Sequence, residues 1–222
     1  MESEERRAAR RRSYELVGCG DDPAWFDTLY AEAGRDPQRI PWGALEPHPM
    51  LVEWCVRELA PAGGSLSVLV VGCGLGDDAE HLASLGHEVT AFDISPEAVA
   101  WCRTRFAAAA VRYEVADLFA LPAAWHGAFD LVAEIYTVQA IAPSLHLGAL
   151  RAAQAAIAPG GRMLVIGRRV SAVPPSPPPP PWPLSRALIE SAGSGGVALQ
   201  AYEELADGDG TPRVRATYRR AR

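Results

Sequence analysis

The feature that most constrains this chain is an apolar run that ends in three closely spaced glycines, VLVVGCGLGDDAEHL (residues 68–82). A short apolar run bounded by glycine is typical of a buried strand, and the polar and apolar residues that follow are typical of a helix. Glycine at the turn between them lets the backbone approach a ligand closely. The segment therefore predicts a strand–loop–helix unit that holds a ligand at its glycine loop.

The rest of the chain continues this alternation. Strands are expected at residues 67–72, 88–93, 111–117, 129–136 and 161–169, and helices at residues 77–86, 95–108, 143–158 and 184–192. Strands that alternate with helices pair in parallel through right-handed crossovers. Two further strand-like runs, 197–205 and 213–221, flank the turn sequence ADGDGTP and predict an antiparallel hairpin. We expect an α/β fold: a Rossmann-like, doubly wound, seven-stranded sheet with a C-terminal antiparallel hairpin.

Composition excludes several kinds of chemistry. The chain has no lysine, since all 21 basic residues are arginine. This excludes a P-loop lysine and a pyridoxal-phosphate Schiff base, because both need an amine. The net charge of −6 argues against a nucleic-acid partner. No apolar run approaches the roughly 20 residues of a membrane span, and the charged N-terminus does not resemble a secretory signal. The four cysteines form no CxxC pair, which favours the reducing cytoplasm and no metal site.

Nearby acidic residues limit the class of ligand that the glycine loop can bind. Asp93 ends the second expected strand, where its carboxylate can accept both ribose hydroxyls of a nucleoside. The third glycine falls one position early for a dinucleotide fingerprint, and Asp77 and Asp78 follow it at the helix N-terminus. We expect these two carboxylates to satisfy the helix N–H groups and to oppose a phosphate there. A nucleoside with a cationic or zwitterionic tail fits better.

The series VLVVGCGLG, AFD, VAD and FDLV resembles the motifs of class I S-adenosylmethionine-dependent methyltransferases. The resemblance spans roughly residues 65–170 and implies S-adenosylmethionine as cofactor. It implies the following cofactor contacts: Gly72, Cys73, Gly74 and Gly76 along the methionine and ribose, Asp93 on the ribose hydroxyls, Ile94 and Leu118 beside the adenine, Asp117 on its amino group, and Glu134 on the cofactor's amino group. For Glu134, a solvated loop acid is an equally open interpretation.

One position departs from the family. The acid that usually stands two residues before the first loop glycine, and orients the methionine ammonium, is Val70 here. Asp77, Asp78 or Glu134 can substitute for it, or the chain binds the cofactor weakly. This departure leaves a non-catalytic binding module open as an alternative. A relative that kept the cofactor for cyclisation or decarboxylation is a second alternative.

The resemblance also suggests how the chain is divided. Residues 1–60 are expected to form a helical segment and lid over the cofactor, and residues 61–222 the methyltransferase domain. The front segment is similar to small-molecule methyltransferases of the thiopurine and tellurite-resistance type, through Trp25, Tyr30 and Trp42. Trp42 is the better lid candidate, whereas Trp25 and Trp54 favour core positions. The proline-rich residues 171–183 predict a stiff loop across the carboxyl ends of the strands.

The expected reaction is methyl transfer to an O, N or S atom of a small molecule, without nucleic acid, membrane or metal, by a monomer or homodimer. Alignment and exclusion of water are the enzyme's main tasks in such a displacement. The catalytic candidates are Tyr136 and His146, although the helical run around His146 favours a surface residue over a general base. The substrate-binding candidates are Tyr30, Trp42, Gln139, Arg168 and Trp182. Arg168 or Arg169, after the fifth strand, can pair with an acidic substrate group.

Overall fold

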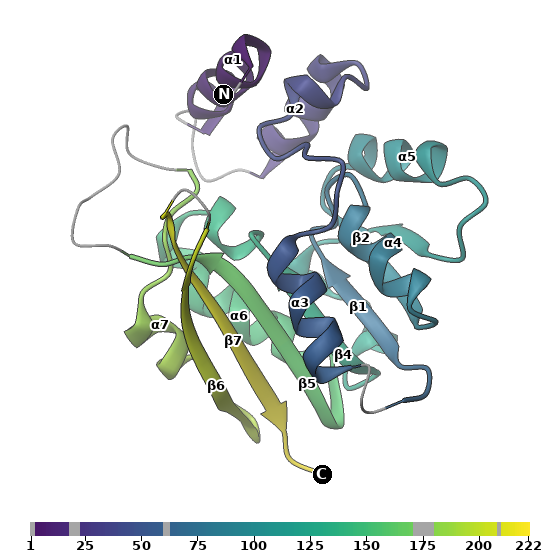
Figure 1. Cartoon of the computed structure of the whole chain (residues 1–222), viewed down its shortest axis with the longest axis vertical. Helices are drawn as coiled ribbons and strands as arrows, with labels where there is room; N and C mark the ends of the chain where they lie inside the picture. Colours follow the sequence, from purple (N-terminus) through teal and green to yellow (C-terminus); the bar gives the residue numbers. More distant parts are fainter. Residues whose placement is uncertain (1–2, 18–22, 60–62, 171–179, 208–209) are drawn as a thin grey trace.

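The computed structural model describes residues 3–17, 23–59, 63–170, 180–207 and 210–222 (Figure 1). In these residues seven strands form one sheet, in the order β3-β2-β1-β4-β5-β7-β6. The strands are β1 (Ser67–Val71), β2 (Glu88–Asp93), β3 (Arg112–Val115), β4 (Phe129–Ile135), β5 (Ile157–Arg168), β6 (Val197–Ala206) and β7 (Pro212–Arg220). Strands β1 to β5 pair in parallel, and β7 runs antiparallel to both β5 and β6. The predicted sheet and its C-terminal hairpin are confirmed.

Helices cover both faces of the sheet. They are α1 (Glu4–Val17), α2 (Ala24–Ala33), α3 (Pro49–Glu58), α4 (Asp77–Ser84), α5 (Pro96–Arg105), α6 (His146–Ala155) and α7 (Arg186–Ser191). Successive strand residues point to opposite faces. Val70 therefore lies in one core with Trp54 of α3 and Leu82 of α4, whereas Val71 lies in the other core with Leu150 of α6. Within the described residues, no helix has the length and apolar character needed to cross a membrane.

Helices α1 and α2 lie beyond the sheet at the end to which β1 points (Figure 1). A separate apolar cluster joins them to the glycine-loop region. In this cluster Trp25 and Tyr30 of α2 lie with Leu75 of the loop and Trp101 of α5. The N-terminal aromatic residues are therefore held next to the carboxyl ends of the parallel strands.

The predicted helix over residues 143–158 is wrong at both ends. A 3-10 turn, Pro143–Leu145, precedes α6, and β5 begins at Ile157 rather than at residue 161. Ile157 is fully buried and pairs with Phe129 of β4, so it joins the sheet before the Pro-Gly-Gly sequence. The register then shifts between Phe129 and Leu131, which accommodates the irregular residues. The proline-rich loop predicted at residues 171–183 lies outside the described residues as far as residue 179.

Candidate functional site

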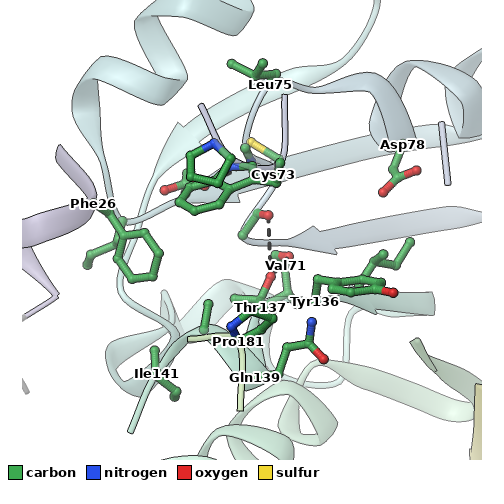
Figure 2. Close-up of a pocket in the computed structure, with 18 of the residues that line it drawn as sticks. Phe26, Val71, Cys73, Leu75, Asp78, Tyr136, Thr137, Gln139, Ile141 and Pro181 are labelled. Atoms are coloured by element: carbon green, nitrogen blue, oxygen red, sulfur yellow. Dashed lines mark hydrogen bonds between the residues drawn. The ribbon is translucent and has the colours of Figure 1, made fainter. Parts of the chain in front are cut away.

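A cavity of about 460 Å³ opens at the carboxyl ends of the parallel strands. Its wall includes residues 71–78 after β1, residues 92–94 at the end of β2, residues 116–119 after β3 and residues 135–137 after β4. Figure 2 shows that side chains from distant segments, among them Phe26, Cys73, Asp78 and Tyr136, surround the same space. This is where open α/β sheets bind ligands, because adjacent loops diverge there.

The glycine loop forms one wall of the cavity. Gly72, Gly74 and Gly76 have φ values of 60°, 55° and 91°, in the left-handed region that favours glycine. The N–H of Cys73 donates a hydrogen bond of 2.8 Å to the carbonyl of Phe92, which ties the loop to the end of β2. The glycines therefore bring the loop backbone to the cavity wall, beside the side chains of Cys73 and Leu75.

Asp93 lies beside this loop at the cavity wall. Its Oδ2 accepts a hydrogen bond of 3.0 Å from the N–H of Gly74, and its Oδ1 accepts one of 3.0 Å from the N–H of Ser95. Burial raises the pKa of Asp93 to about 6 despite these bonds. A carboxylate oxygen has two lone pairs, so each oxygen retains capacity for a ligand hydroxyl. The position is suited to a diol.

Three more of the expected cofactor residues line the cavity further along the strand ends. Asp117 Oδ1 accepts a hydrogen bond of 2.8 Å from the N–H of Phe119, which fixes the turn after β3. Ile94 and Leu118 line the same cavity with Asp117. Two aliphatic side chains and one carboxylate could hold the flat, amino-bearing ring of a nucleoside.

The expectation that Asp77 and Asp78 satisfy the first N–H groups of α4 is wrong. Gly76 precedes the helix without a side-chain cap. Asp77 instead binds the guanidinium of Arg105 at 2.7 and 3.0 Å. Asp78 Oδ1 accepts a hydrogen bond of 2.7 Å from the backbone N–H of His48. Burial raises the pKa of Asp78 to about 6. Asp77 is thus neutralised by an ion pair, while Asp78 is a sparsely partnered carboxylate at the cavity wall.

Glu134 is placed away from the cavity lining. Its side chain is fully buried, and its Oε1 accepts hydrogen bonds of 2.8 Å from the N–H groups of Thr137 and Val138. Its Oε2 has no partner among the described residues, and burial raises the pKa of this carboxyl to about 7. Glu134 therefore holds the loop after β4 in place. The interpretation of Glu134 as a solvated acid is wrong, and the expected cofactor residue does not line the cavity.

Aromatic residues of the N-terminal segment form another part of the cavity wall. Trp42 donates its indole N–H to the hydroxyl of Tyr30 over 2.7 Å, and both residues line the cavity. The Trp42 ring lies edge-on to the rings of Trp25 and Phe26, at centroid distances of 6.2 and 6.1 Å. Trp42 remains 39% exposed, whereas Trp54 is 1% exposed in the core. Trp42 is therefore placed at the mouth of the cavity.

His146 and Trp182 are not among the cavity-lining residues. His146 is buried at the start of α6, with its Nε2 2.9 Å from the carbonyl oxygen of Ile141. This position suits a local structural contact rather than proton transfer to a ligand, and it is not the surface position considered above. Trp182 donates its backbone N–H to the carbonyl of Gln139 over 2.7 Å, and Pro180 and Pro181 line the cavity in its place.

Gln139 and Arg168 do line the cavity. Gln139 Oε1 accepts a hydrogen bond of 2.6 Å from the backbone N–H of Arg168, so the amide also fixes the end of β5. Tyr136 has a φ of 65° and lines the cavity as well. Burial raises the pKa of Tyr136 to about 12, which keeps its phenol protonated at neutral pH. Tyr136 is therefore a hydrogen-bond donor rather than a base.

Sequence reasoning missed His48, Thr137 and Arg213, which all line the cavity. The His48 ring lies 5.2 Å from the ring of Tyr136, and burial lowers its pKa to about 4. Its Nδ1 accepts the N–H of Met50 at 3.2 Å, which leaves the proton of the neutral ring on Nε2. The only local signal for His48 is its place before a proline that starts a helix. Among the described residues, no group of three or more His, Cys, Asp or Glu could hold a metal ion.

Comparison with known proteins agrees with this arrangement. A family model described as a methyltransferase domain matches residues 68–161. A ubiquinone biosynthesis O-methyltransferase of Xanthomonas axonopodis pv. citri (strain 306) is 32% identical over 143 residues, which are 64% of this chain and 54% of that protein. The chain thus spans about half the length of the curated relatives it matches.

Solved structures share the fold across most of the chain. One, from work on the conversion of a disulfide bond into a thioacetal group during echinomycin biosynthesis, has a TM-score of 0.72 at 24% identity, over 89% of this chain and 91% of that one. The 1,6-didemethyltoxoflavin-N1-methyltransferase of Burkholderia thailandensis has a TM-score of 0.66 at 19% identity, over 89% and 86%. The strand order and the glycine loop are those of this fold, and the matching family model shows that residues 68–161 are similar to a methyltransferase domain.

Proposed function

We propose that this protein transfers a methyl group from S-adenosylmethionine to an O, N or S atom of a small molecule. The observation that carries the proposal is the composition of the cavity. Gly72, Gly74, Asp93 and Asp117 line it at the ends of β1 to β3, and a different set of polar side chains, including Arg168, lines it at the end of β5. One cavity thus offers separate places for a nucleoside and an acceptor.

The residues on the nucleoside side fit the cofactor. A buried carboxylate with spare lone pairs, Asp93, suits the ribose hydroxyls. Ile94 and Leu118 suit the faces of adenine, and Asp117 suits its amino group. The arginine nearest the glycine loop, Arg105, is occupied by Asp77, so this part of the wall offers little to a phosphate. These side chains favour a nucleoside without phosphates.

Asp78 takes the role of the acid that Val70 replaces. Val70 is buried in the core and cannot reach the cavity. Of the three substitutes, Asp77 is held by Arg105, and Glu134 lies outside the lining. Asp78 lines the cavity, and within the described part of the chain its carboxylate accepts one hydrogen bond, from the N–H of His48. This leaves the carboxylate available to an ammonium group.

The remaining residues orient the acceptor and exclude water. When bound, the cofactor supplies a methyl group on an already activated sulfonium. Tyr30, Trp42 and Phe26 cover the cavity, and His48 and Tyr136 present N–H and O–H donors to the acceptor. Neither donor accepts a proton readily at neutral pH, so an acceptor atom that loses its proton with little help fits best.

A calorimetric titration tests the cofactor assignment. We expect S-adenosylhomocysteine to bind the wild type at micromolar concentration, NAD not to bind, and Asp93→Ala to lose the binding. An acceptor screen that measures S-adenosylhomocysteine release then tests methyl transfer. Failure of both ligands to bind would overturn the proposal. Binding without turnover across the screen would favour the alternatives, a binding module or a relative with other chemistry.

We also propose the cellular compartment and the oligomeric state in which the protein acts. Among the described residues Cys55, Cys73 and Cys102 are free thiols, which favours the reducing cytoplasm. We propose a monomer or homodimer that acts on a small molecule rather than on nucleic acid.

A further inference from the structure

Two arginines face each other at the far end of the cavity. Arg168 of β5 and Arg213 of β7 are direct partners in the antiparallel pairing of these strands, and both line the cavity. Direct partners in an antiparallel pair project from the same face of the sheet, and two like charges in this arrangement repel each other. Burial and the positive charge of Arg213 accordingly lower the pKa of Arg168.

Arg215, the next arginine along the same face of the sheet, is neutralised by acidic side chains. Arg215 pairs with Ile166, two residues from Arg168 on β5. Its guanidinium donates to Glu203 at 2.8 and 3.0 Å, to Glu53 at 3.3 Å and to a backbone carbonyl at 3.0 Å. The charge of Arg215 is thus balanced by two carboxylates, as expected for a buried arginine with a structural role.

Arg168 and Arg213 are not neutralised in this way. Arg213 Nη2 binds Asp207, but Arg213 Nε and Nη1 have no partner among the described residues, although its side chain is only 8% exposed. Arg168 Nε is also buried without a partner in the described part of the chain. Asp207 binds Arg213, and among the described residues no carboxylate is paired with Arg168. Buried N–H donors without acceptors cost free energy, so the arrangement favours an anion that fills them.

We propose that Arg168 and Arg213 together bind an anionic group, a carboxylate or a similar oxoanion, on the methyl acceptor. The assignment rests on the proposed function and names the substrate class: small molecules that carry an acidic group. The planar guanidinium fork is the side chain best suited to an oxoanion, because it donates two parallel N–H bonds. The guanidinium of Arg213 also lies 5.6 Å from the Tyr136 ring, which limits the directions in which it can point.

The position of the pair favours the acceptor over the cofactor. The glycine loop follows β1, and on one side of it Asp93 ends β2 and Asp117 follows β3. Arg168 and Arg213 belong to β5 and β7, which lie on the other side of β1 beyond β4. The carboxylate of the cofactor's methionine is the other possible source of an anion, and the experiment must separate the two.

The test uses benzoate and benzamide, which match in shape and differ in charge. Each is titrated by calorimetry into the full chain, with and without saturating S-adenosylhomocysteine. We expect benzoate to bind at least about tenfold more tightly than benzamide, since charge-assisted hydrogen bonds are the strong ones. Arg168→Gln and Arg213→Gln should abolish this preference and leave the Kd of S-adenosylhomocysteine unchanged.

Arg169→Gln is the matched control. Arg169 adjoins Arg168 but is not among the cavity-lining residues, and its guanidinium lies 3.6 Å from Glu204. This variant removes the same charge and should retain the benzoate preference. Arg168→Gln should also leave the Tm of the free protein unchanged or raise it, because it relieves the repulsion with Arg213. Arg168→Lys, which keeps the charge but not the fork, should retain part of the preference.

Each outcome bears on a different claim. Equal binding of benzoate and benzamide to the wild type would overturn the anion site and leave the methyltransferase proposal intact. Loss of S-adenosylhomocysteine affinity in Arg168→Gln and Arg213→Gln would assign the anion to the cofactor and overturn the substrate class. If S-adenosylhomocysteine does not bind the wild type but benzoate selectivity persists, the proposed function fails while the anion site remains, and its assignment to a methyl acceptor falls.

Discussion

The hydroxyl of Thr137 donates a hydrogen bond of 2.8 Å to the carbonyl of Val71 and occupies the space next to Gly72 (Figure 2). A Cβ atom on Gly72 would lie 2.3 Å from Thr137 Oγ1. This hydrogen bond ties the loop after β4 to the end of β1. Residue 72 must be glycine because a side chain would clash with Thr137 and because its φ lies in the left-handed region. The backbone N–H of Thr137 in turn donates a hydrogen bond to the carboxylate of Glu134.

Gly72→Ala should lower the free energy of unfolding by about 1–3 kcal/mol beyond the cost of the left-handed φ alone, because Thr137 must move. It should also weaken S-adenosylhomocysteine binding. Urea unfolding and calorimetry measure the two effects. Gly34→Ala is the control, since Gly34 has a φ of 59° but nothing within 4 Å of an added Cβ. Equal losses in both variants would show that the contact with Thr137 contributes nothing.

Asp78→Asn should weaken S-adenosylhomocysteine binding about tenfold or more, because it removes the carboxylate that would bind the ammonium group. Its raised pKa of about 6 means that Asp78 is ionised above this pH and protonated below it. Wild-type affinity should therefore fall between pH 7.5 and pH 5, and Asp78→Asn should reduce the fall. Part of the fall should remain, because burial raises the pKa of Asp93 to about 6 as well.

Asp77→Asn is the comparison for this experiment, since Asp77 is held by Arg105. It should affect stability more than affinity. An Asp77→Asn variant that loses more affinity than Asp78→Asn would reverse the assignment of the two acids.

Glu134→Gln should change how stability depends on pH. The pKa of Glu134 is about 7 in the folded protein and close to 4.3 when unfolded. Between these values the folded state binds the extra proton, so the wild-type free energy of unfolding gains up to about 1.4 kcal/mol per unit as pH falls. Glutamine has no such proton. Relative to Glu134→Gln, the wild type should gain stability from pH 8 to pH 5 in urea unfolding, and a constant difference would contradict the buried, ionisable carboxyl.

Trp42→Ala and Trp54→Ala should separate ligand binding from stability. Trp42 lines the cavity at 39% exposure, so its removal should weaken ligand binding and cost about 1 kcal/mol of stability through the lost bond to Tyr30. Trp54 is buried in the core, and its removal should cost about 3–5 kcal/mol. Thermal melts and calorimetry on both variants check this. Comparable destabilisation by the two substitutions would place Trp42 in the core rather than at the cavity mouth.

The sheet, its parallel strands, its terminal hairpin and the glycine loop are all predictable from the amino-acid sequence. These follow from hydrophobic periodicity and from the φ requirements of glycine, which are properties of short segments. Ser95 is a further local feature: it directly precedes Pro96 and caps α5 by accepting a hydrogen bond from the N–H of Ala98. Asp93 is predicted from its place at the end of a recognisable strand, whereas Asp117 is expected from the resemblance to the methyltransferase motifs.

The contacts between polar side chains, in contrast, depend on how the chain packs in three dimensions. Asp77 is bound by Arg105 from another helix, and Glu134 turns inward beneath Thr137. Nothing in the local sequence around Asp77 or Glu134 indicates either contact. The facing of Arg168 and Arg213 depends on the register of β5 against β7, which is set by the packing of both faces of the sheet. Charge and burial at the cavity are therefore long-range properties, because they depend on which strands and helices come to lie side by side.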